Sequence, residues 1–518
     1  MKPGALLGLL CAVIALCLGQ PAAAKKGEWL RADTHNFIIY TDGSQKQLGD
    51  FAVEVERFDA LLRAMFDVPG AEKANRLTIF VLSNSSSVAK LAGDKSRTLA
   101  GFYSPRREGS FAVTNRERGA GKLDLSGQTV LFHEYSHHFM FRYFDYAYPP
   151  WYVEGFAEYL STAEFDDQGM WSYGKPAFHR AYDLIAGADM PIETLLFGNP
   201  SQMSRAGRSA FYGRAWLFVH MLNSTPEYKE QLKRFLEMVG RGIEQRKAAV
   251  EAFGDLGELE KALDRYLKSS LSYRKGSTPL VYRSDIAITA LDEVGSRLVE
   301  LSLARLMGND LPATRDALAG LAAKAPGNAA VQLELALAER DIAADSNPSD
   351  FGPAEQALDR AIAADGNLGR AHAFKALMMM YRLNDQGVDD PAEWKQVRDH
   401  IAIANRQDTE DPLPLLAYYE SFLYEGRAVP DIAHEALAKA FSLVPEDKTT
   451  RVQYAFDLAK QQQYDKAIRL IEFLANDPHD AEQGKRLVAQ LEAMRDGVPY
   501  LDTPALPVES EEEESAAP

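Results

Sequence analysis

The chain has 518 residues, of which 46% are hydrophobic and 25% charged, and its formal net charge is −17. That length exceeds what one compact core normally supports, so the sequence predicts two or three domains of ordinary globular composition. The negative charge argues against general binding to nucleic acid or to an anionic membrane, because such binding requires a basic surface.

The first 24 residues have the layout of a secretory signal peptide. A lysine precedes an apolar stretch from Ala5 to about Leu18, and a run of alanines ends at Ala24. The stretch is short for a membrane span, so we expect cleavage near Ala24 and no stable membrane anchor afterwards, with a retained anchor as the alternative. Cys11 and Cys17 both lie in this segment, and each follows a leucine, which does not fit a lipoprotein signal. A periplasmic or secreted bacterial location is expected.

Residues 25–275 are predicted to form an α+β domain, in which a small sheet is followed by helices. The expected early elements are a strand at 36–40, a helix at 46–66, a strand at 77–82 and short strands at 100–104 and 110–114. From Gly127 helices dominate, with an interruption near Pro149 and Pro150, until about residue 270.

A linker at 276–284 leads into a second region, 285–498, that is almost entirely helical and rich in alanine and leucine. Its turns recur at Pro326, Asp365, Pro445 and Pro478, and the last pair is 33 residues apart. That spacing resembles tetratricopeptide repeats, whose period is close to 34 residues, although the other spacings of 39 and 80 are irregular. A non-repetitive helical domain is the alternative. Residues 499–518 form an acidic end that we expect to be a disordered tail.

The segment HEYSH, from His133 to His137, matches the pattern H-E-x-x-H, and a chance match has odds on the order of one in a hundred. On a helix the two imidazoles project from one face, where their neutral nitrogens can bind one zinc ion. Glu134 is rotated by about 100° from His133, so its carboxylate lies beside the metal and can take a proton from an activated water. His138 lies off this face and is expected to pack or to face solvent.

A catalytic zinc ion takes three protein ligands, so a third is needed. Asp145 is about two helical turns beyond His137, too far to share the ion. After the two prolines, WYVEGFAEYL starts a second helix that carries Glu154 and Glu158 on one face. A helix that returns to the metal is therefore the expected source of the third ligand.

HEYSH followed after sixteen residues by the glutamate of WYVEGFAEY resembles the gluzincin metallopeptidases. It is most similar to the peptidase MA-like domains and more distantly similar to aminopeptidase N-type enzymes. The resemblance covers about residues 29–275 and implies a zincin-like fold, with Glu154 as the third zinc ligand. It also implies that Glu158 holds a ligand histidine in orientation; a solvated helix residue is the alternative.

The same resemblance implies a tyrosine that donates to the oxyanion, and in SAFYGRAWLFVHML this position falls on Tyr212. A core or surface role is the alternative for Tyr212, and His220 reads as an ordinary helix residue. The G-x-M-E-N motif of aminopeptidases is missing from YSPRREGSFAVTN, so aminopeptidase activity is not supported. The strand at 110–114 is expected to be an edge strand that pairs with an extended substrate.

These features predict a secreted zinc metallopeptidase of the gluzincin type, fused to a tetratricopeptide-like array. His133, His137 and Glu154 are expected to hold Zn²⁺, with Glu134 as general base and Tyr212 as oxyanion donor. The array is expected to bind a protein partner or to present a protein or peptide substrate. The rival hypothesis is a periplasmic repeat scaffold with an inactive or structural zinc domain. Zinc-dependent hydrolysis of something other than a peptide is a third possibility.

Overall fold

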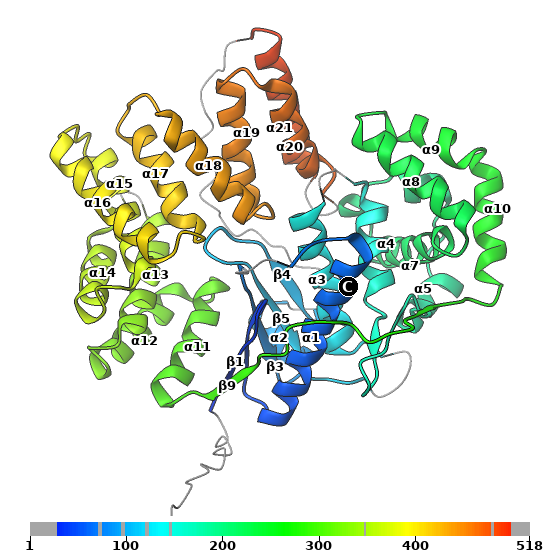
Figure 1. Cartoon of the computed structure of the whole chain (residues 1–518), viewed down its shortest axis with the longest axis horizontal. Helices are drawn as coiled ribbons and strands as arrows, with labels where there is room; N and C mark the ends of the chain where they lie inside the picture. Colours follow the sequence, from blue (N-terminus) through cyan, green and yellow to red (C-terminus); the bar gives the residue numbers. More distant parts are fainter. Residues whose placement is uncertain are drawn as a thin grey trace, which may run out of the picture.

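The computed structural model describes residues 28–70, 75–94, 99–119, 124–144, 148–346, 349–477 and 481–498. The expected signal peptide, the acidic tail and Asp145 lie outside these ranges. A mixed sheet with helices on both faces is followed by a long helical array, which curves round the sheet (Figure 1). Among the described residues, none of the helices combines the length and the hydrophobicity that a bilayer crossing requires.

The main sheet has the strand order β4-β5-β3-β2-β1-β9, in which β2, β3 and β5 are parallel and the others join antiparallel. The strands are β1 (Leu30–Asp33), β2 (Phe37–Thr41), β3 (Leu77–Leu82), β4 (Phe102–Ser104), β5 (Phe111–Asn115) and β9 (Ala287–Ala290). The predicted strands are confirmed to within two residues. The expectation that segment 110–114 forms an edge strand is wrong, because β5 lies between β4 and β3. Every residue of β5 is buried, as an interior strand requires, and β4 forms the edge.

Helices cover both faces of this sheet. One face packs against α1 (Gln45–Phe66) and α3 (Gly127–Tyr143), whose apolar side chains share a core with β1, β2 and β3. The other face packs against α2 (Ser85–Leu91) and α11 (Glu293–Leu306). Strand β9 therefore belongs to the main sheet, and helix α11 packs on one face of that sheet while also contributing Leu301 to the core of the helical region, although the sequence placed both in the helical region that begins at 285.

Further helices form a subdomain beyond α3. They are α4 (Pro150–Leu160), α5 (Ala181–Ile185), α6 (Ile192–Phe197), α7 (Arg205–Leu222), α8 (Pro226–Gly240), α9 (Gln245–Phe253) and α10 (Leu256–Leu267). A small sheet of β6 (Glu164–Phe165), β7 (Trp171–Tyr173) and β8 (Arg274–Lys275) lies beside them, and 3₁₀ helices η1 (Phe178–Arg180) and η2 (Pro200–Gln202) interrupt the loops. Buried aromatic rings join α4 to α7 and α8, as the Trp151–Phe218 pair shows with ring centroids 4.9 Å apart.

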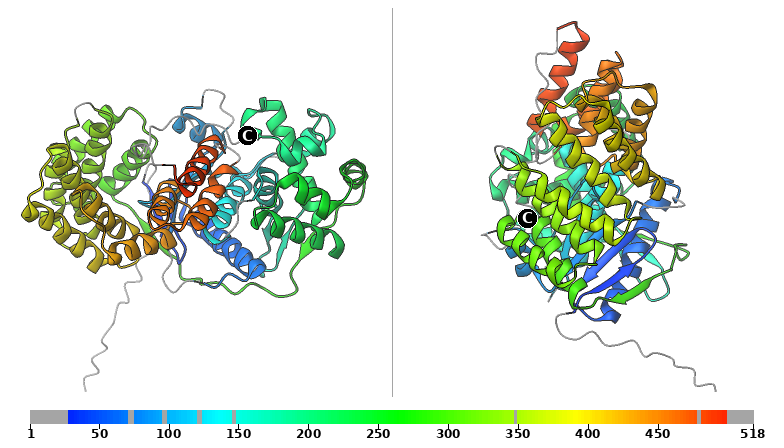
Figure 2. Two further views of the ribbon diagram at one scale, coloured as in Figure 1. Left: turned by 90° about the horizontal axis from the view of Figure 1, so that it is seen from above. Right: turned by 90° about the vertical axis from the view of Figure 1, so that its left-hand side faces the viewer.

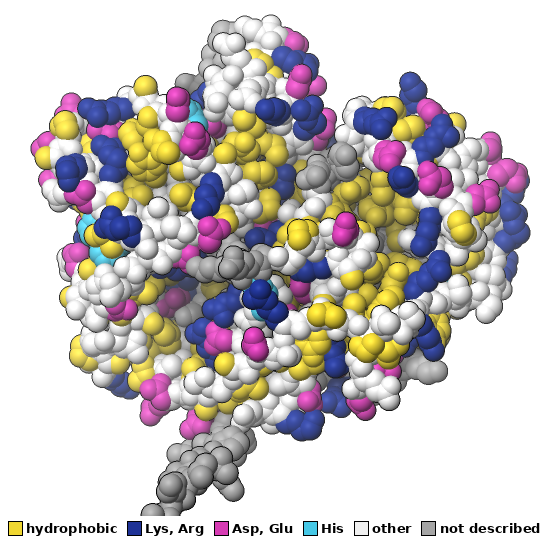
Figure 3. Space-filling model, in the orientation of Figure 1, with side chains coloured by type: hydrophobic (Ala, Val, Ile, Leu, Met, Phe, Trp, Pro, Cys, Tyr) yellow, Lys and Arg dark blue, Asp and Glu magenta, His cyan; other side chains and the backbone are white. Residues whose placement is uncertain are grey.

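From α11 onward each helix packs against the next, and this helical array has its own apolar cores. After α11 it comprises α12 (Leu311–Lys324), α13 (Ala329–Ala344), α14 (Gly352–Ala364), α15 (Gly369–Asp385), α16 (Pro391–Gln407), α17 (Pro412–Tyr424), α18 (Asp431–Leu443), α19 (Lys448–Lys460), α20 (Tyr464–Ala475) and α21 (Ala481–Arg495). Seen from above, helices α12–α17 of the array and the α8–α10 helices lie at opposite ends of the molecule, and the C-terminal helices of the array (orange to red) lie in the middle with the sheet and α3 (Figure 2). Acidic and basic side chains are interspersed over the face shown in Figure 3.

The turn between β4 and β5 is held by the array. The side chain of Glu108 pairs with Arg340 on α13, and Arg107 Nη1 donates to Glu420 Oε1 on α17 over 3.2 Å. Ser110 Oγ donates to Glu446 Oε1, just before α19, also over 3.2 Å. The contacting residues lie on or next to α13, α17 and α19, and Arg370 of α15 also donates to the Glu108 carbonyl oxygen. Every second helix of the array therefore contacts this turn. Part of the surface that we expected a partner or substrate to use therefore binds the chain's own turn.

Candidate metal centre

Helix α3 is fixed against the sheet by the residues at its start. The Ser126 side chain accepts a hydrogen bond from Thr129 N and caps the helix. Gly127 approaches β5 so closely that a Cβ atom there would lie 1.9 Å from Asn115 O, and Thr114 Oγ1 donates to Gly127 O over 2.7 Å. Only glycine allows this approach.

Three neighbours of the motif histidines fix the rotation of α3. Phe132 stacks on Phe58 of α1 with ring centroids 4.0 Å apart, and Tyr135 Oη donates to Asp59 Oδ1 over 2.7 Å. His138 is buried, and its Nδ1 lies 2.9 Å from Tyr103 Oη on β4. Burial lowers the pKa of His138 well below its usual value, helped by Arg142. Because these side chains face α1 and the sheet, the residues on the other side of α3 face α4.

Helix α4 begins at Pro150, because proline suits the first helical turn and Pro149 ends the preceding segment. It lies tightly on α7: a Cβ atom at Gly155 would come within 2.6 Å of Ala215 O. All residues of α4 from Trp151 to Leu160 are buried, including the two glutamates. The helix therefore holds Glu154 at a fixed position opposite α3.

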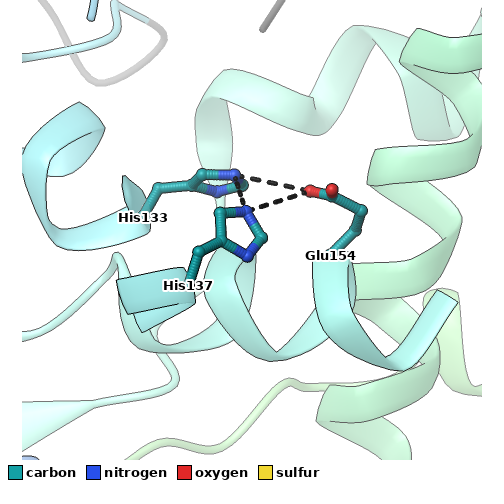
Figure 4. Close-up of side chains that lie close together, drawn as sticks. All are labelled: His133, His137 and Glu154. Carbon is teal, nitrogen blue, oxygen red and sulfur yellow. Dashed lines mark hydrogen bonds and ion pairs between the residues drawn. The ribbon is translucent and has the colours of Figure 1, made fainter. Parts of the chain in front are cut away.

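His133, His137 and Glu154 converge on one point, as Figure 4 shows. The two Nε2 atoms of the histidines lie 3.0 Å apart. Glu154 Oε2 lies 3.4 Å from His133 Nε2 and 3.5 Å from His137 Nε2. Two imidazole nitrogens and one carboxylate oxygen are a common donor set for catalytic zinc.

The triangle formed by these three atoms has the size that a zinc ion requires. With metal–ligand distances of about 2.0–2.1 Å, tetrahedral geometry places ligand atoms about 3.3–3.4 Å apart. The three observed separations bracket that value. The residues therefore fit a zinc ion, although the geometry alone does not choose zinc over another cation that accepts nitrogen and oxygen ligands.

The Glu154 carboxylate is kept ionised by the histidines. Burial alone would raise the pKa of Glu154, but the adjacent His137 and His133 imidazoles outweigh it and hold that pKa well below its usual value. An ionised carboxylate is the form that binds a metal.

Glu158, one turn after Glu154, lies behind His133. Its Oε1 is 3.4 Å from His133 Nδ1, the ring nitrogen that faces away from the converging point. Arg180 Nε donates to the same Oε1 over 3.1 Å, while His179 Nε2 lies 3.0 Å from Oε2. Burial opposes ionisation of Glu158, but Arg180 and His179 hold its pKa well below the usual value. Glu158 is thus a buried carboxylate, not a solvated helix residue.

A cavity of about 30 Å³ opens beside these side chains, which is room for a water molecule. Its wall includes Glu134 and His133, so the carboxylate next to the first histidine faces the same space as that histidine. Gly101, next to the edge strand β4, forms part of the opposite wall. The full lining comprises Ala100, Gly101, Leu125, Thr129, Val130, His133, Glu134, Glu158, Ser161, His179 and Arg180.

Tyr212 is buried on α7 within reach of the same charges. Its ring lies under the Arg180 guanidinium, whose Cζ is 5.3 Å from the ring centroid. Burial raises the pKa of Tyr212 well above its usual value, and the Glu154 carboxylate raises it further. The phenol therefore stays protonated at neutral pH and keeps its hydrogen for donation. His220 is a buried residue of helix α7, and its Nε2 lies 2.9 Å from Gly174 O.

Sequence reasoning missed His179 and Arg180. They follow Glu154 by more than twenty residues on η1, and no spacing rule links that segment to the H-E-x-x-H helix. The only signal was that His179 is one of just ten histidines in the chain.

Comparisons with known proteins assign no function to this site. No protein-family model matches the chain, and no curated protein matches it. Among solved structures, the crystal structure of yeast Tom70 is similar over 61% of this chain and 68% of that chain, with 12% sequence identity and a TM-score of 0.25. A score that low does not establish a shared fold.

Proposed function

We propose that the chain is a zinc-dependent peptidase whose centre is formed by α3 and α4. The observation that carries this proposal is the convergence of His133 Nε2, His137 Nε2 and Glu154 Oε2 on one point beside Glu134. A zinc ion held there would polarise the carbonyl of a substrate and lower the pKa of a water molecule. We also propose that the mature chain lies outside the cytoplasm, because the first 24 residues have the layout of a signal peptide.

The chain's own groups supply the proton transfers. Glu134 lines the cavity, so its carboxylate takes a proton from the attacking water and returns it to the leaving nitrogen. Tyr212, kept protonated by burial, donates a hydrogen bond to the oxygen on which negative charge develops. Strand β4, which forms the edge of the sheet and begins beside the cavity wall at Gly101, is the strand on which an extended peptide would pair.

One observation favours the rival function, a repeat scaffold whose zinc domain is structural or inactive. The cavity beside His133 and Glu134 is too small for a peptide. The array also reaches the metal helix, because Phe473 of α20 packs on Phe141 with ring centroids 5.2 Å apart.

The Glu134→Gln variant separates the two functions. Both proteins are loaded with zinc and given a broad mixture of peptides, and new termini are measured by mass spectrometry. The peptidase proposal expects both proteins to retain about one zinc ion and only the wild type to cleave. If both keep zinc and neither cleaves, the peptidase proposal fails and the scaffold function gains support.

A further inference from the structure

The short segment that carries η1 places a histidine and an arginine behind the metal centre. Arg180 and His179 both contact the Glu158 carboxylate, one at each oxygen. The Arg180 side chain is only 10% exposed and that of Glu158 only 2%, so the pair is shielded from solvent. A largely buried charged pair keeps a well-defined geometry, because charge-assisted hydrogen bonds hold both side chains.

The Glu158 carboxylate, held in this way, contacts His133, one of the proposed metal ligands. Its Oε1 is shared between Arg180 Nε and the Nδ1 side of His133, while Nε2 of the same ring faces the other ligand atoms. A carboxylate at Nδ1 fixes the tautomer and the ring orientation of a histidine and makes its other nitrogen a better ligand. His137 lacks this support, since its buried Nδ1 has no hydrogen-bond partner among the described residues.

Arg180 has a second contact, on the opposite side of the site. Its guanidinium lies over the ring of Tyr212 on α7, and Asp183 Oδ2 lies 3.8 Å from its Nη1. Asp183 is itself held by a hydrogen bond from Ser209 Oγ over 2.7 Å. A single guanidinium thus touches the carboxylate behind His133 and the ring of Tyr212, which sequence analysis assigned to oxyanion stabilisation.

We propose that Arg180, assisted by His179, is a positioning residue of the metal centre: it holds Glu158 against His133 and sets the ring of Tyr212. The inference rests on the proposed metal centre, and in it Arg180 acts through Glu158 and Tyr212 instead of serving as a metal ligand. It gives a role to η1, a segment that follows β7 and that no sequence motif marks.

Zinc affinity, measured by competition with a chromogenic chelator, tests this inference without reference to peptide cleavage. Arg180→Gln removes the charge and the shared hydrogen bonds, so we expect zinc to bind about 10–100-fold more weakly. Arg180→Lys keeps the charge without the planar fork and should recover part of the loss. The matched control is Arg214→Gln on α7, whose side chain is 12% exposed and pairs with Glu260 and Asp264 away from the site. It should bind zinc like the wild type.

The visible spectrum of the cobalt-substituted protein supplies a second readout that a loss of stability does not change. We expect its bands to shift in Arg180→Gln and to stay unchanged in Arg214→Gln. An Arg180→Gln protein that melts earlier but keeps the wild-type zinc affinity and cobalt spectrum would overturn the positioning role. A wild type that binds zinc yet cleaves no peptide would remove the peptidase function alone, and a wild type that binds no zinc would overturn both.

Discussion

The metal centre on α3 and α4 and the contact between the 105–110 turn and the helical array both bury charged groups. In the contact, each charge meets its opposite: Glu108 meets Arg340, and Arg107 meets Glu420. At the metal centre, two imidazole nitrogens and one carboxylate oxygen, all of which can donate an electron pair to a metal, face one another at 3.0–3.5 Å, and the Arg180 guanidinium lies behind them. The first arrangement is complete in itself and holds two parts of the chain together. The second arrangement is suited to receive a cation.

The two regions also differ in the distance along the chain that separates their members. His133, His137 and Glu154 lie within 22 residues on consecutive helices, whereas Arg107 and Glu420 are 313 residues apart. If the metal centre serves binding and the turn contact serves assembly, substitutions in the two regions should have separate effects.

Removing a ligand should abolish metal binding and leave the assembly intact. Glu154→Gln keeps the size of the side chain but loses its charge, so zinc affinity should fall by more than about 100-fold, beyond the loss expected for residues behind the ligands. Chelator competition measures the affinity, and small-angle scattering should give an unchanged radius of gyration. Tight zinc binding by this variant would show that Glu154 is not a ligand.

Removing one member of the turn contact should destabilise the folded assembly and leave metal binding intact. Glu108→Ala leaves Arg340 in a largely buried position with only Asp341 as an acidic partner, which should destabilise the protein by about 2–3 kcal/mol. Thermal unfolding measures this effect, with Glu258→Ala, from an exposed pair with Lys261, as the control that changes little. Equal melting temperatures for the two variants would show that the contact does not hold the array.

The turn contact should also weaken in acid. Burial opposes ionisation of Glu108, but Arg340 outweighs it and lowers the Glu108 pKa to about 2, below the ordinary value of 4.5. Because the folded-state pKa is the lower one, the stabilisation is present above pH 4.5 and is lost as the pH falls towards 2. The difference in melting temperature between wild type and Glu108→Gln should therefore shrink over that range. A constant difference between pH 6 and pH 3 would contradict the pairing.

The smallest effect should come from the aromatic contact between Phe473 of the array and Phe141 of the metal helix. Phe473→Ala removes the ring that packs on Phe141 of α3, a loss of about 1 kcal/mol. We expect a slightly lower melting temperature but faster removal of zinc by a chelator, because the array covers the metal helix less firmly. An unchanged rate of zinc removal would mean that α20 does not limit access to the site.

The difference in chain distance explains how much was predictable. Helix α3 and the positions of His133, His137 and Glu154 follow from spacings of three to four residues and from a proline break, which are local signals. The edge position of β4, by contrast, depends on which strands pair, and β5 was mistaken for the edge because both carry short apolar patterns. The roles of His179, Arg180 and Glu108 depend on partners brought close only by the folded chain, so no pattern in the sequence could show them.

The claim that His133, His137 and Glu154 hold zinc can be tested by anomalous diffraction at the zinc absorption edge. The crystals are grown from the full chain in the presence of zinc. The account predicts a strong peak within about 2.0–2.1 Å of His133 Nε2, His137 Nε2 and a Glu154 carboxylate oxygen. Crystals of His133→Ala should lack that peak. A zinc-soaked wild-type crystal with zinc elsewhere and no peak between these three residues would contradict the account.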